Sequence, residues 1–435
     1  MKLDTQEQEY KASQFNLWQS NEGKVYIVNT LSKSIIEIKT EEKNYVKRIL
    51  SGDALLKKDE KFFEYQKILI DQGNLVKKEF NEKAALGYLY RRSHFSDSFL
   101  NITIIPTMRC NFKCPYCFET EKGIHWNDER VESLKKFALV NFPQKQSVQL
   151  NFFGGEPLLE WNRIKNFLGF CVELENKNSF QLVTGITTNG YLMDEEKAIA
   201  LLDEYHCKGI QITIDGCRES HDQTRVLHNG SPSFDRVLGN FKNLLKVKSR
   251  RPDNRTLINL RVNLLNNSKE QAEELLSNFS NDEKKFFTAY FRPIYNTKNF
   301  CVSNENQSNL EEFYQLLDLH HIKRFSPGKS NYSYCEGDSG LNTFELLPDL
   351  TVWKCINDDK CDDAKLGEIN SEGQLIAGIE KLAKWSCNDP FSDDNCKNCS
   401  YLPLCYGGCP LHYLKTGEKN CFYEKHFNLV KHLMS

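Results

Sequence analysis

The chain of 435 residues lacks any uninterrupted apolar run of about 18 residues, the length that a membrane-spanning helix needs. Residues 1–7 are polar and contain no apolar stretch of the kind found in a signal peptide. Charge of neither sign is in excess, because the formal net charge is −2. The sequence therefore predicts binding neither to nucleic acid nor to a membrane. We expect a cytoplasmic protein.

Cysteine is missing from residues 1–95 but abundant afterwards, since the chain has 16 in all. Thiols stay reduced in the cytoplasm, so many cysteines indicate metal binding more often than disulfides. Most of them fall between residues 110 and 117 or between 335 and 421. The scattered ones, which we interpret as small buried hydrophobic residues, are Cys171, Cys207, Cys217 and Cys301.

Residues 99–321 alternate strand-like apolar runs with helix-like segments. The expected strands are residues 99–105, 148–153, 180–187, 209–214, 257–264 and 286–291. The expected helices include residues 128–140, 195–206, 234–246 and 269–277. These repeats predict an α/β fold in which a parallel sheet curls into a partial (β/α)6 barrel, similar to a TIM barrel. Active sites of such barrels lie at the C-terminal ends of the strands.

Three cysteines follow the first of these strands in the order Cys110-x3-Cys114-x2-Cys117, with Tyr116 directly before the third. Three thiolates can bind three corners of a cubane iron–sulfur cluster and leave the fourth iron open to a small molecule. A zinc knuckle, or three buried core cysteines, is the alternative interpretation.

This loop resembles that of the radical S-adenosylmethionine (radical SAM) enzymes. The resemblance implies a catalytic 4Fe-4S cluster on the three cysteines, with SAM bound to its open iron. In that family an electron from the cluster cleaves SAM, and the resulting 5'-deoxyadenosyl radical abstracts a hydrogen atom from the substrate. An electron donor such as flavodoxin or ferredoxin is implied as a partner.

The strand ends carry further motifs that resemble those of the family. Residues 154–157 match its GGEP motif, residues 188–190 its TNG motif, and residues 221–225 its HDxxR stretch. Thr213, near the end of the fourth strand, replaces the usual serine but keeps a hydroxyl. The residues that the resemblance assigns to SAM binding are Tyr116, Gly154, Gly155, Glu156, Thr188, Asn189, Thr213, Asp215 and Arg225.

Arginine suits the SAM carboxylate because its planar fork pairs with both oxygens. Arg225 as a solvated loop residue, and Asp215 as a residue that stabilises its own turn, are the alternatives. Arg261, Asn263 and Arg292 are further candidates for the same pocket.

The C-terminal cysteines resemble the SPASM extension of radical SAM enzymes, which carries two auxiliary 4Fe-4S clusters. The resemblance assigns Cys396, Cys399, Cys405 and Cys421 to the second auxiliary cluster. It assigns Cys335, Cys355 and Cys409 to the first. The cofactors implied are three 4Fe-4S clusters and SAM, and a zinc-binding module is the alternative for this segment.

Two departures from the SPASM pattern matter. Leu350 replaces the usual glycine before Cys355, so we expect the hairpin there to turn differently. No cysteine lies shortly after Cys335 as the usual fourth ligand of the first auxiliary cluster. We expect Cys361 to take that place, with Cys387 as a further candidate. The alternative is an iron left open for a substrate thiolate.

The expected domains are residues 1–95, 96–325 and 326–435. Within the first, strands are expected at 15–18, 25–29 and 34–38, and helices at 41–50 and 59–72. This region resembles the winged-helix domain that recognises precursor peptides, in which a leader segment adds a strand to a sheet edge. A plain N-terminal cap is the alternative.

The function expected from these resemblances is a peptide maturase that closes a thioether or carbon–carbon crosslink within a ribosomally made precursor peptide. A sulfatase-maturing enzyme, which oxidises Cys or Ser to formylglycine, is the alternative. Two features count against it: the long segment before Cys110, and Ile356 where those relatives have an Asp base. A non-catalytic iron–sulfur scaffold is a third possibility, opposed by the complete three-cysteine loop.

Overall fold

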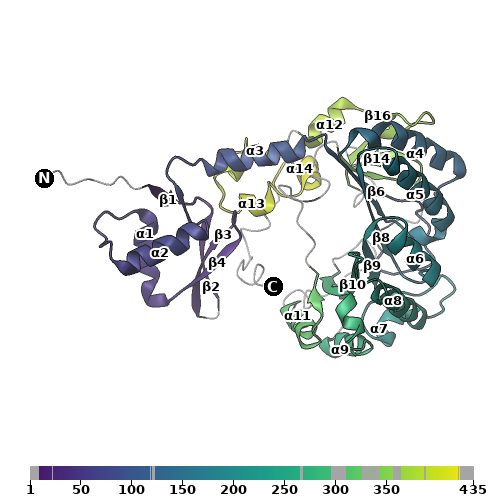
Figure 1. Ribbon diagram of the computed structural model, residues 1–435, viewed down its shortest axis with the longest axis horizontal. Helices are drawn as coiled ribbons and strands as arrows, with labels where there is room; N and C mark the ends of the chain where they lie inside the picture. The colour runs from purple at the N-terminus through teal and green to yellow at the C-terminus, as the bar shows by residue number, and fades with distance from the viewer. Residues whose placement is uncertain are drawn as a thin grey trace. The chain divides into compact units, whose positions relative to one another are not determined.

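The computed structural model describes residues 9–21, 23–117, 119, 123–264, 268–294, 310–325, 335, 342–355, 364–386, 388–419 and 421. The chain forms two compact units (Figure 1). One contains residues 1–95, 329–340 and 383–435, and the other contains residues 96–328 and 341–382. This division differs from the expected domain ranges, because residues 341–382 group with the predicted barrel and the residues after 383 group with the N-terminal region.

The larger unit is built on one sheet of 11 strands, in the order β12-β11-β10-β9-β8-β7-β6-β13-β14-β15-β16. The six predicted strands are confirmed as β6 (Phe99–Ile104), β7 (Ser147–Phe152), β8 (Gln181–Thr188), β9 (Cys207–Thr213), β10 (Leu257–Leu264) and β11 (Thr288–Pro293). Each pairs in parallel with the next. β6 and β7 bury every second side chain, as a sheet with its core on one face requires.

Strands that were not predicted extend this sheet at both ends. They are β12 (Lys323–Arg324), β13 (Thr343–Leu346), β14 (Thr351–Trp353), β15 (Lys365–Ile369) and β16 (Leu375–Ala377). β12 and β13 continue the parallel part, and the last three strands are antiparallel.

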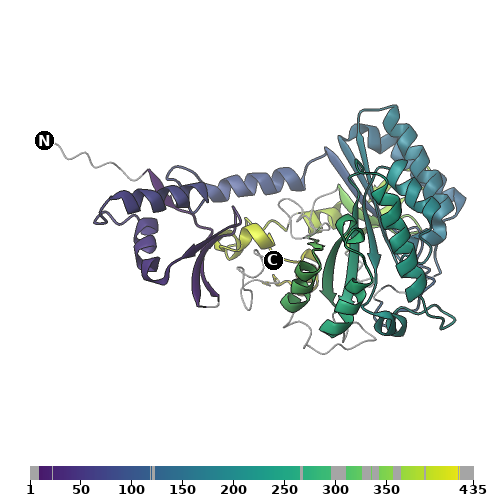
Figure 2. The ribbon, with the colours of Figure 1, turned by 60° about the horizontal axis from the view of Figure 1, so that its bottom comes forward.

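Helices cover the outer side of the parallel strands, as Figures 1 and 2 show. They are α4 (Asp128–Asn141), α5 (Trp161–Asn176), α6 (Glu195–Asp203), α7 (Arg218–Thr224), α8 (Phe234–Ser249), α9 (Lys269–Ser277) and α11 (Leu310–Leu319). The four predicted helices of this region are confirmed, with α6 ending earlier than expected. Asn127 and Asp194 cap the starts of α4 and α6 with their side chains.

The parallel register brings the C-terminal ends of the strands to one edge of the sheet. Ile104 of β6 pairs with Phe152 of β7, and Phe152 pairs with Ile186 of β8. Thr213 of β9 pairs with Arg261 of β10. The loops that carry the sequence motifs therefore leave the sheet at the same edge.

The hairpin between β13 and β14 corrects one expectation. Leu350 has a φ of 66°, the left-handed conformation that glycine adopts most readily. The turn therefore has the backbone conformation that suits a glycine, although the residue at this position is a leucine. The Leu350 side chain is only 4% exposed, and its burial offsets a left-handed cost of about 1–2 kcal/mol.

The smaller unit contains the predicted N-terminal strands and helices. β2 (Asn16–Asn21), β3 (Lys24–Asn29) and β4 (Ser34–Ile38) form an antiparallel sheet with β3 in the centre. The helices are α1 (Lys43–Ser51) and α2 (Glu60–Asp71). Elements that were not predicted are β1 (Tyr10–Ala12), β5 (Leu75–Lys77), which pairs with β1, and α3 (Glu82–His94).

The C-terminal cysteine-rich segment packs against this N-terminal region. Leu86 and Tyr90 of α3 share a buried cluster with Cys396, Leu402 and Tyr406. The segment contains α12 (Ile379–Ser386), α13 (Leu402–Cys405) and α14 (Pro410–Thr416). No helix in the described ranges is long and apolar enough to span a bilayer.

Candidate active site

The three-cysteine loop is closed at its base by backbone pairing between its two ends. Met108 N donates to Ile124 O at 2.8 Å, and Trp126 N donates to Pro106 O at 2.8 Å. The Trp126 side chain is fully buried. The loop is therefore fixed to the sheet at both ends, and the cysteines lie between these fixed points.

The GGEP segment grips the backbone just before Cys110. Glu156 N donates to Arg109 O at 2.9 Å, and Gly155 N donates to Thr107 O at 3.1 Å. A Cβ atom at Gly155 would lie 2.2 Å from Arg109 O, so no other residue fits there. Gly154 has a φ of 111°, which also requires glycine. Both glycines therefore set how closely the two loops approach.

The Glu156 carboxylate joins two strand ends. It is fully buried and accepts hydrogen bonds from Thr188 Oγ1 (2.7 Å), Asn189 N (2.8 Å) and Leu158 N (3.0 Å). Burial raises the pKa of this carboxyl, and the hydrogen bonds oppose the rise. Because its oxygens are already bound within the protein, Glu156 braces the GGEP and TNG segments against each other.

The TNG segment in turn contacts the cysteine loop. Asn189 Nδ2 donates to Asn111 Oδ1 at 2.8 Å and lies 3.8 Å from Cys110 Sγ. Phe112 N donates to the same sulfur at 3.4 Å. Donors aimed at a cysteine sulfur favour its thiolate form, which is the form that binds iron.

The HDQTR stretch and the residues directly after it also contact the cysteine loop. Lys113 N donates to Val226 O at 2.8 Å, and the His228 ring lies 3.0 Å from Cys110 O through Nε2. The Arg225 guanidinium lies 5.4 Å from the centre of the Phe112 ring. Arg225 is 7% exposed, so its interpretation as a solvated loop residue is wrong.

A buried polar network centres on the Tyr116 phenol. Tyr116 donates to the Asp215 carboxylate and accepts from Arg225 Nη1 at 3.0 Å. Asn263 N donates to Asp215 Oδ1 at 3.3 Å, and Asn263 Nδ2 lies 3.4 Å from the phenol oxygen. The Asp215 carboxylate therefore binds residues well beyond its own turn. Burial raises the pKa of Tyr116 well above its usual value, so the phenol keeps its proton.

The other candidates lie nearby or farther out on the same strands. Thr213 is 7% exposed at the end of β9. Arg261 Nε donates to Asn263 Oδ1 at 2.8 Å, so Arg261 supports the network through Asn263. Arg292 lies on β11 with an exposed side chain.

The three cysteines fit an iron–sulfur cluster by their chemistry. Cys110 and Cys114 are partly exposed and Cys117 is exposed. Burial raises the pKa of Cys110 to about 12 and that of Cys114 to about 11, so without a cation both stay protonated. Iron supplies that charge. Within the described ranges, no three His, Cys, Asp or Glu side chains surround one point as ligands of a single ion would. A cubane cluster binds each thiolate through a different iron, so its ligands stand farther apart.

The C-terminal cysteines fall into two groups by their surroundings. The pKa of Cys405 is raised to about 11, chiefly by burial and in part by the nearby thiols of Cys399 and Cys421. Burial and Asp393 raise the pKa of Cys396, and Cys405 contributes as well. Cys396, Cys399, Cys405 and Cys421, the set assigned to the second auxiliary cluster, are therefore neighbours.

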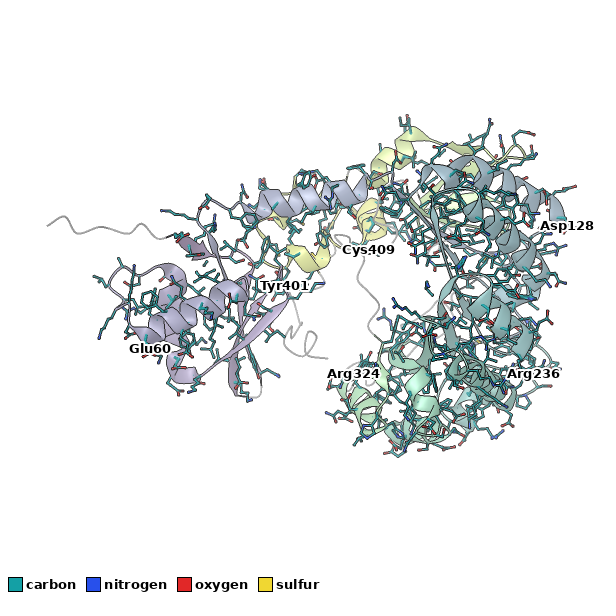
Figure 3. All side chains as sticks on the ribbon, in the orientation of Figure 1. Glu60, Asp128, Arg236, Arg324, Tyr401 and Cys409 are labelled. Atoms are coloured by element: carbon teal, nitrogen blue, oxygen red, sulfur yellow. The ribbon has the colours of Figure 1, made fainter. Side chains whose placement is uncertain are left out.

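The ligands expected for the first auxiliary cluster are spread over both units. Cys355 follows β14 in the larger unit, and Cys335 is an exposed residue of the smaller one. Cys409 directly precedes α14, and Tyr401 directly precedes α13 (Figure 3). Cys361 and Cys387 lie outside the described residues, as does Cys301. Cys171, Cys207 and Cys217 are buried, as predicted.

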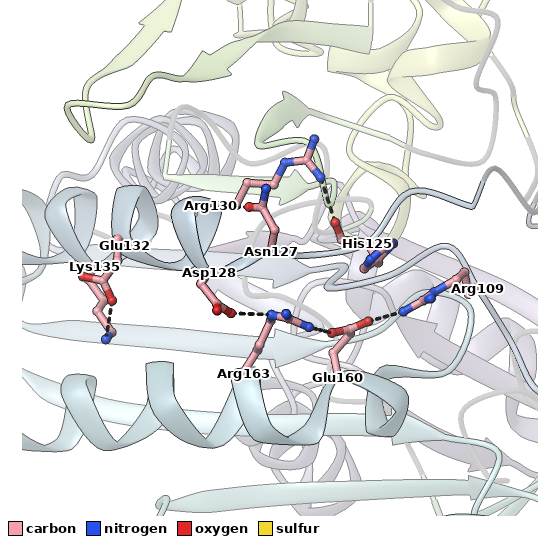
Figure 4. A network of polar contacts seen from close by, with 9 residues as sticks. All are labelled: Arg109, His125, Asn127, Asp128, Arg130, Glu132, Lys135, Glu160 and Arg163. Carbon is pink, nitrogen blue, oxygen red and sulfur yellow. Dashed lines mark hydrogen bonds and ion pairs between the residues drawn. The ribbon is translucent and has the colours of Figure 1, made fainter.

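One charged network beside the loop was missed by the sequence analysis. Glu160 binds both Arg109 and Arg163, and Arg163 also binds Asp128 (Figure 4). Its only sequence signals are an arginine directly before Cys110 and an acidic residue shortly after the GGEP motif. Neither signal is specific, because charged residues are common in loops and at helix starts.

The chain is similar in sequence to a known enzyme superfamily and to several characterised proteins. Residues 104–277 match the family model described as the radical SAM superfamily. The cysteine-type anaerobic sulfatase-maturating enzyme of Clostridium novyi (strain NT) is 24% identical over 341 residues, which cover 71% of this chain and 87% of that protein. The radical SAM cyclopropyl synthase TigE of Paramaledivibacter caminithermalis is 22% identical over 334 residues, covering 71% of this chain and 67% of that protein.

Solved structures show the same fold. Streptococcus suis SuiB bound to S-adenosylmethionine has a TM-score of 0.53 at 17% identity, covering 94% of this chain and 97% of that one. SuiB bound to its precursor peptide SuiA has a TM-score of 0.50, also at 17% identity and with the same coverage. The likeness to SuiB thus extends over both units of the chain.

Proposed function

Because residues 104–277 form a radical SAM domain, we propose that the protein is a radical SAM/SPASM peptide maturase. It cleaves SAM, abstracts a hydrogen atom from a ribosomally made precursor peptide in the cytoplasm, and closes a thioether or carbon–carbon crosslink within that peptide. One observation carries the proposal: the GGEP, TNG and HDQTR segments each contact the cysteine loop at the C-terminal edge of the sheet.

Each of these segments has a role in the proposed site. Cys110, Cys114 and Cys117 would hold a 4Fe-4S cluster, which when bound supplies the electron that cleaves SAM. The two GGEP glycines let this segment pack closely against the cysteine loop, beside which the methionine end of SAM would bind. Tyr116 and Asp215 hold Arg225 at the inner end of the loop, where its positive charge suits the SAM carboxylate.

The peptide substrate is proposed from the relatives and from the N-terminal sheet. The relatives include a sulfatase-maturating enzyme, the cyclopropyl synthase TigE and SuiB, whose structure contains a precursor peptide. In this chain β2 and β4 are the two outer strands of an antiparallel sheet with β3 between them. An outer strand has unpaired backbone groups to which a leader peptide can add as a further strand.

The C-terminal cysteines are proposed to hold two auxiliary 4Fe-4S clusters. The mutual electrostatic effects among Cys396, Cys399, Cys405 and Cys421 support the second of them. For the first, Cys335, Cys355 and Cys409 remain the proposed ligands, with Cys361 as the fourth. Flavodoxin or ferredoxin would deliver the electrons.

Formylglycine formation is the second candidate, because the Clostridium novyi relative is named as a sulfatase-maturating enzyme. It would require a proton acceptor at the position after Cys355, and the sequence has Ile356 there. The crosslinking reaction is therefore the better supported of the two.

The test begins with anaerobic reconstitution of the full chain. The triple variant Cys110→Ala/Cys114→Ala/Cys117→Ala should lose one cluster's iron and all cleavage of SAM to 5'-deoxyadenosine. The matched control, Cys171→Ala/Cys207→Ala/Cys217→Ala, removes as many thiols from the core and should keep both. Wild-type cleavage by the first variant would contradict the assignment.

The peptide product distinguishes the two candidate reactions. We expect a precursor peptide, found as a short open reading frame beside the gene and coexpressed with the enzyme, to lose two hydrogens and to resist fragmentation between the crosslinked residues. An aldehyde that reacts with a hydrazine probe would instead indicate formylglycine.

A further inference from the structure

Arg109, directly before the first predicted iron ligand, is held by its backbone and by its side chain. Its carbonyl accepts Glu156 N at 2.9 Å, and its own N donates to Thr107 Oγ1 at 3.1 Å. Its guanidinium donates through Nη2 to Glu160 Oε1 at 2.6 Å. Arg109 is joined directly to Cys110, so contacts that fix Arg109 restrict the backbone from which the Cys110 side chain extends.

Glu160 is suited to act as a fixed anchor. Its side chain is 2% exposed, whereas that of Arg109 is 43% exposed. It is the last residue of the short 3-10 helix Pro157–Glu160, which begins at the proline of the GGEP motif, and it directly precedes α5. A buried carboxylate in this position requires charged partners, and it has two of them.

The second partner extends the anchor to the far end of the loop. Arg163 Nη1 donates to Glu160 Oε2 at 2.8 Å, and Arg163 Nε donates to Asp128 Oδ1 at 2.9 Å. Asp128 is the first residue of α4, where the chain leaves the cysteine loop. As Figure 4 shows, the chain of contacts from Arg109 to Asp128 therefore spans the loop from its start to its end.

We infer that Glu160 is a positioning residue for the cluster: by holding the Arg109 side chain it fixes the placement of Cys110. The inference rests on the proposed function, since it assumes that the loop holds a cluster that binds SAM. The Glu160 carboxylate binds Arg109 and Arg163, so it acts on Cys110 through Arg109. Loss of the contact between Glu160 and Arg109 should therefore make the loop release iron faster.

The test uses the reconstituted full-length protein and measures how fast a chelator removes iron, with and without SAM. Iron that SAM protects belongs to the cluster that binds SAM. Glu160→Gln should release this iron about fivefold faster than the wild type, a modest factor because Arg109 is partly exposed. A glutamine carbonyl can accept from one arginine, but its amide nitrogen repels the donors of the other.

Four further variants separate positioning from folding. Arg109→Gln should match Glu160→Gln, and the double variant should be no faster than either single one, because both remove the same contact. Arg163→Gln removes the other partner of Glu160 and keeps the bond to Arg109, so it should release the protected iron more slowly than Arg109→Gln. Glu132→Gln removes an exposed carboxylate of α4 that binds Lys135 at 2.8 Å, and should match the wild type.

Three results would overturn the inference: wild-type iron release from Glu160→Gln, multiplying effects in the double variant, or equal release from Arg163→Gln and Arg109→Gln. The last would mean that Glu160 stabilises only the fold. A wild-type protein without any SAM-protected iron would overturn the proposed function itself, and the inference with it. Normal protection in the wild type together with an unchanged Glu160→Gln variant would overturn the inference alone.

Discussion

The Tyr116 phenol donates a hydrogen bond to the carboxylate of Asp215, a residue 99 positions later in the sequence. Tyr116 lies between two of the loop cysteines, and Asp215 follows β9. The bond therefore ties the proposed cluster loop to the far side of the strand-end motifs. Because Arg225 donates to the same phenol oxygen, Tyr116 also determines where that guanidinium points.

Tyr116→Phe should weaken SAM binding by about tenfold, since it removes one buried charge-assisted hydrogen bond and leaves Arg225 without its acceptor. The aromatic ring remains, so the iron content of the loop should not change. The measurement is a SAM titration of the reconstituted protein, followed by the spectrum of the reduced cluster.

Tyr65→Phe is a matched control for this variant. Tyr65 also donates to a carboxylate, that of Glu42, but it lies in the N-terminal region. The Tyr65→Phe variant should therefore bind SAM with the affinity of the wild type. Equal SAM affinity of Tyr116→Phe and the wild type would show that the network serves the fold and not the ligand.

Gly155→Ala should prevent stable assembly of the cluster loop. The added Cβ would lie 2.2 Å from Arg109 O and 2.6 Å from Arg109 C, and backbone atoms cannot move aside without moving Cys110. We expect a loss of stability of more than about 2 kcal/mol and a clear loss of bound iron. Unfolding curves and iron analysis would measure the two effects.

Gly169→Ala tests whether any glycine replacement in this unit has that effect. Gly169 lies within α5, and a Cβ atom added there would have no neighbouring atom within 4 Å outside its own helix backbone. Its replacement should be neutral, or should stabilise by up to about 1 kcal/mol because alanine favours helix. Iron content like that of the wild type in Gly155→Ala would contradict the clash.

The parallel strands could be predicted because each is an apolar run between polar segments. Residues 257–264 and 269–277 were even predicted with their observed bounds. The additional strands of this sheet could not, since β12 has 2 residues and β14 and β16 have 3 each. Such short strands carry no periodicity, and their pairing depends on β6, β11 and each other.

The division into units could not be read from the sequence for a related reason. The Tyr90 ring of α3 stacks on the Tyr406 ring at 5.9 Å, and Ser400 Oγ donates to Gln14 O at 2.9 Å. These contacts join the two ends of the chain, and nothing local in either segment indicates the other. Deletion of residues 1–95 would therefore expose Leu402 and Tyr406 as well as remove the proposed leader-binding sheet.

The site was predictable as motifs but not as a network. The residue types and their spacing pointed to Cys110, Gly155 and Arg225. The motifs did not indicate that the Glu156 carboxylate would accept hydrogen bonds from Thr188 and Asn189, or that Glu160 would form an ion pair with Arg109. Those relationships depend on how side chains turn at the edge of the folded sheet.

His221 is fully buried, and its protonation should make the stability of the fold depend on pH. Its Nδ1 accepts from Asp215 N at 3.2 Å, and its Nε2 lies 3.1 Å from Ser233 Oγ, so the ring is neutral with its proton on Nε2. Burial, and then the nearby Arg225 charge, hold its pKa well below the usual 6.5. As pH falls below about 6.5 the unfolded chain takes up a proton that the folded chain refuses, so stability must fall with pH.

His221→Asn keeps an acceptor near Nδ1 and removes this titration. Between pH 6.5 and 5.5 the wild type should lose about 1 kcal/mol of unfolding free energy more than the variant does. Denaturant unfolding of the metal-free protein at several pH values would measure the difference, because bound iron adds a pH dependence of its own. Parallel curves for His221→Asn and the wild type would instead mean that His221 takes up its proton in the folded protein as readily as in the unfolded chain.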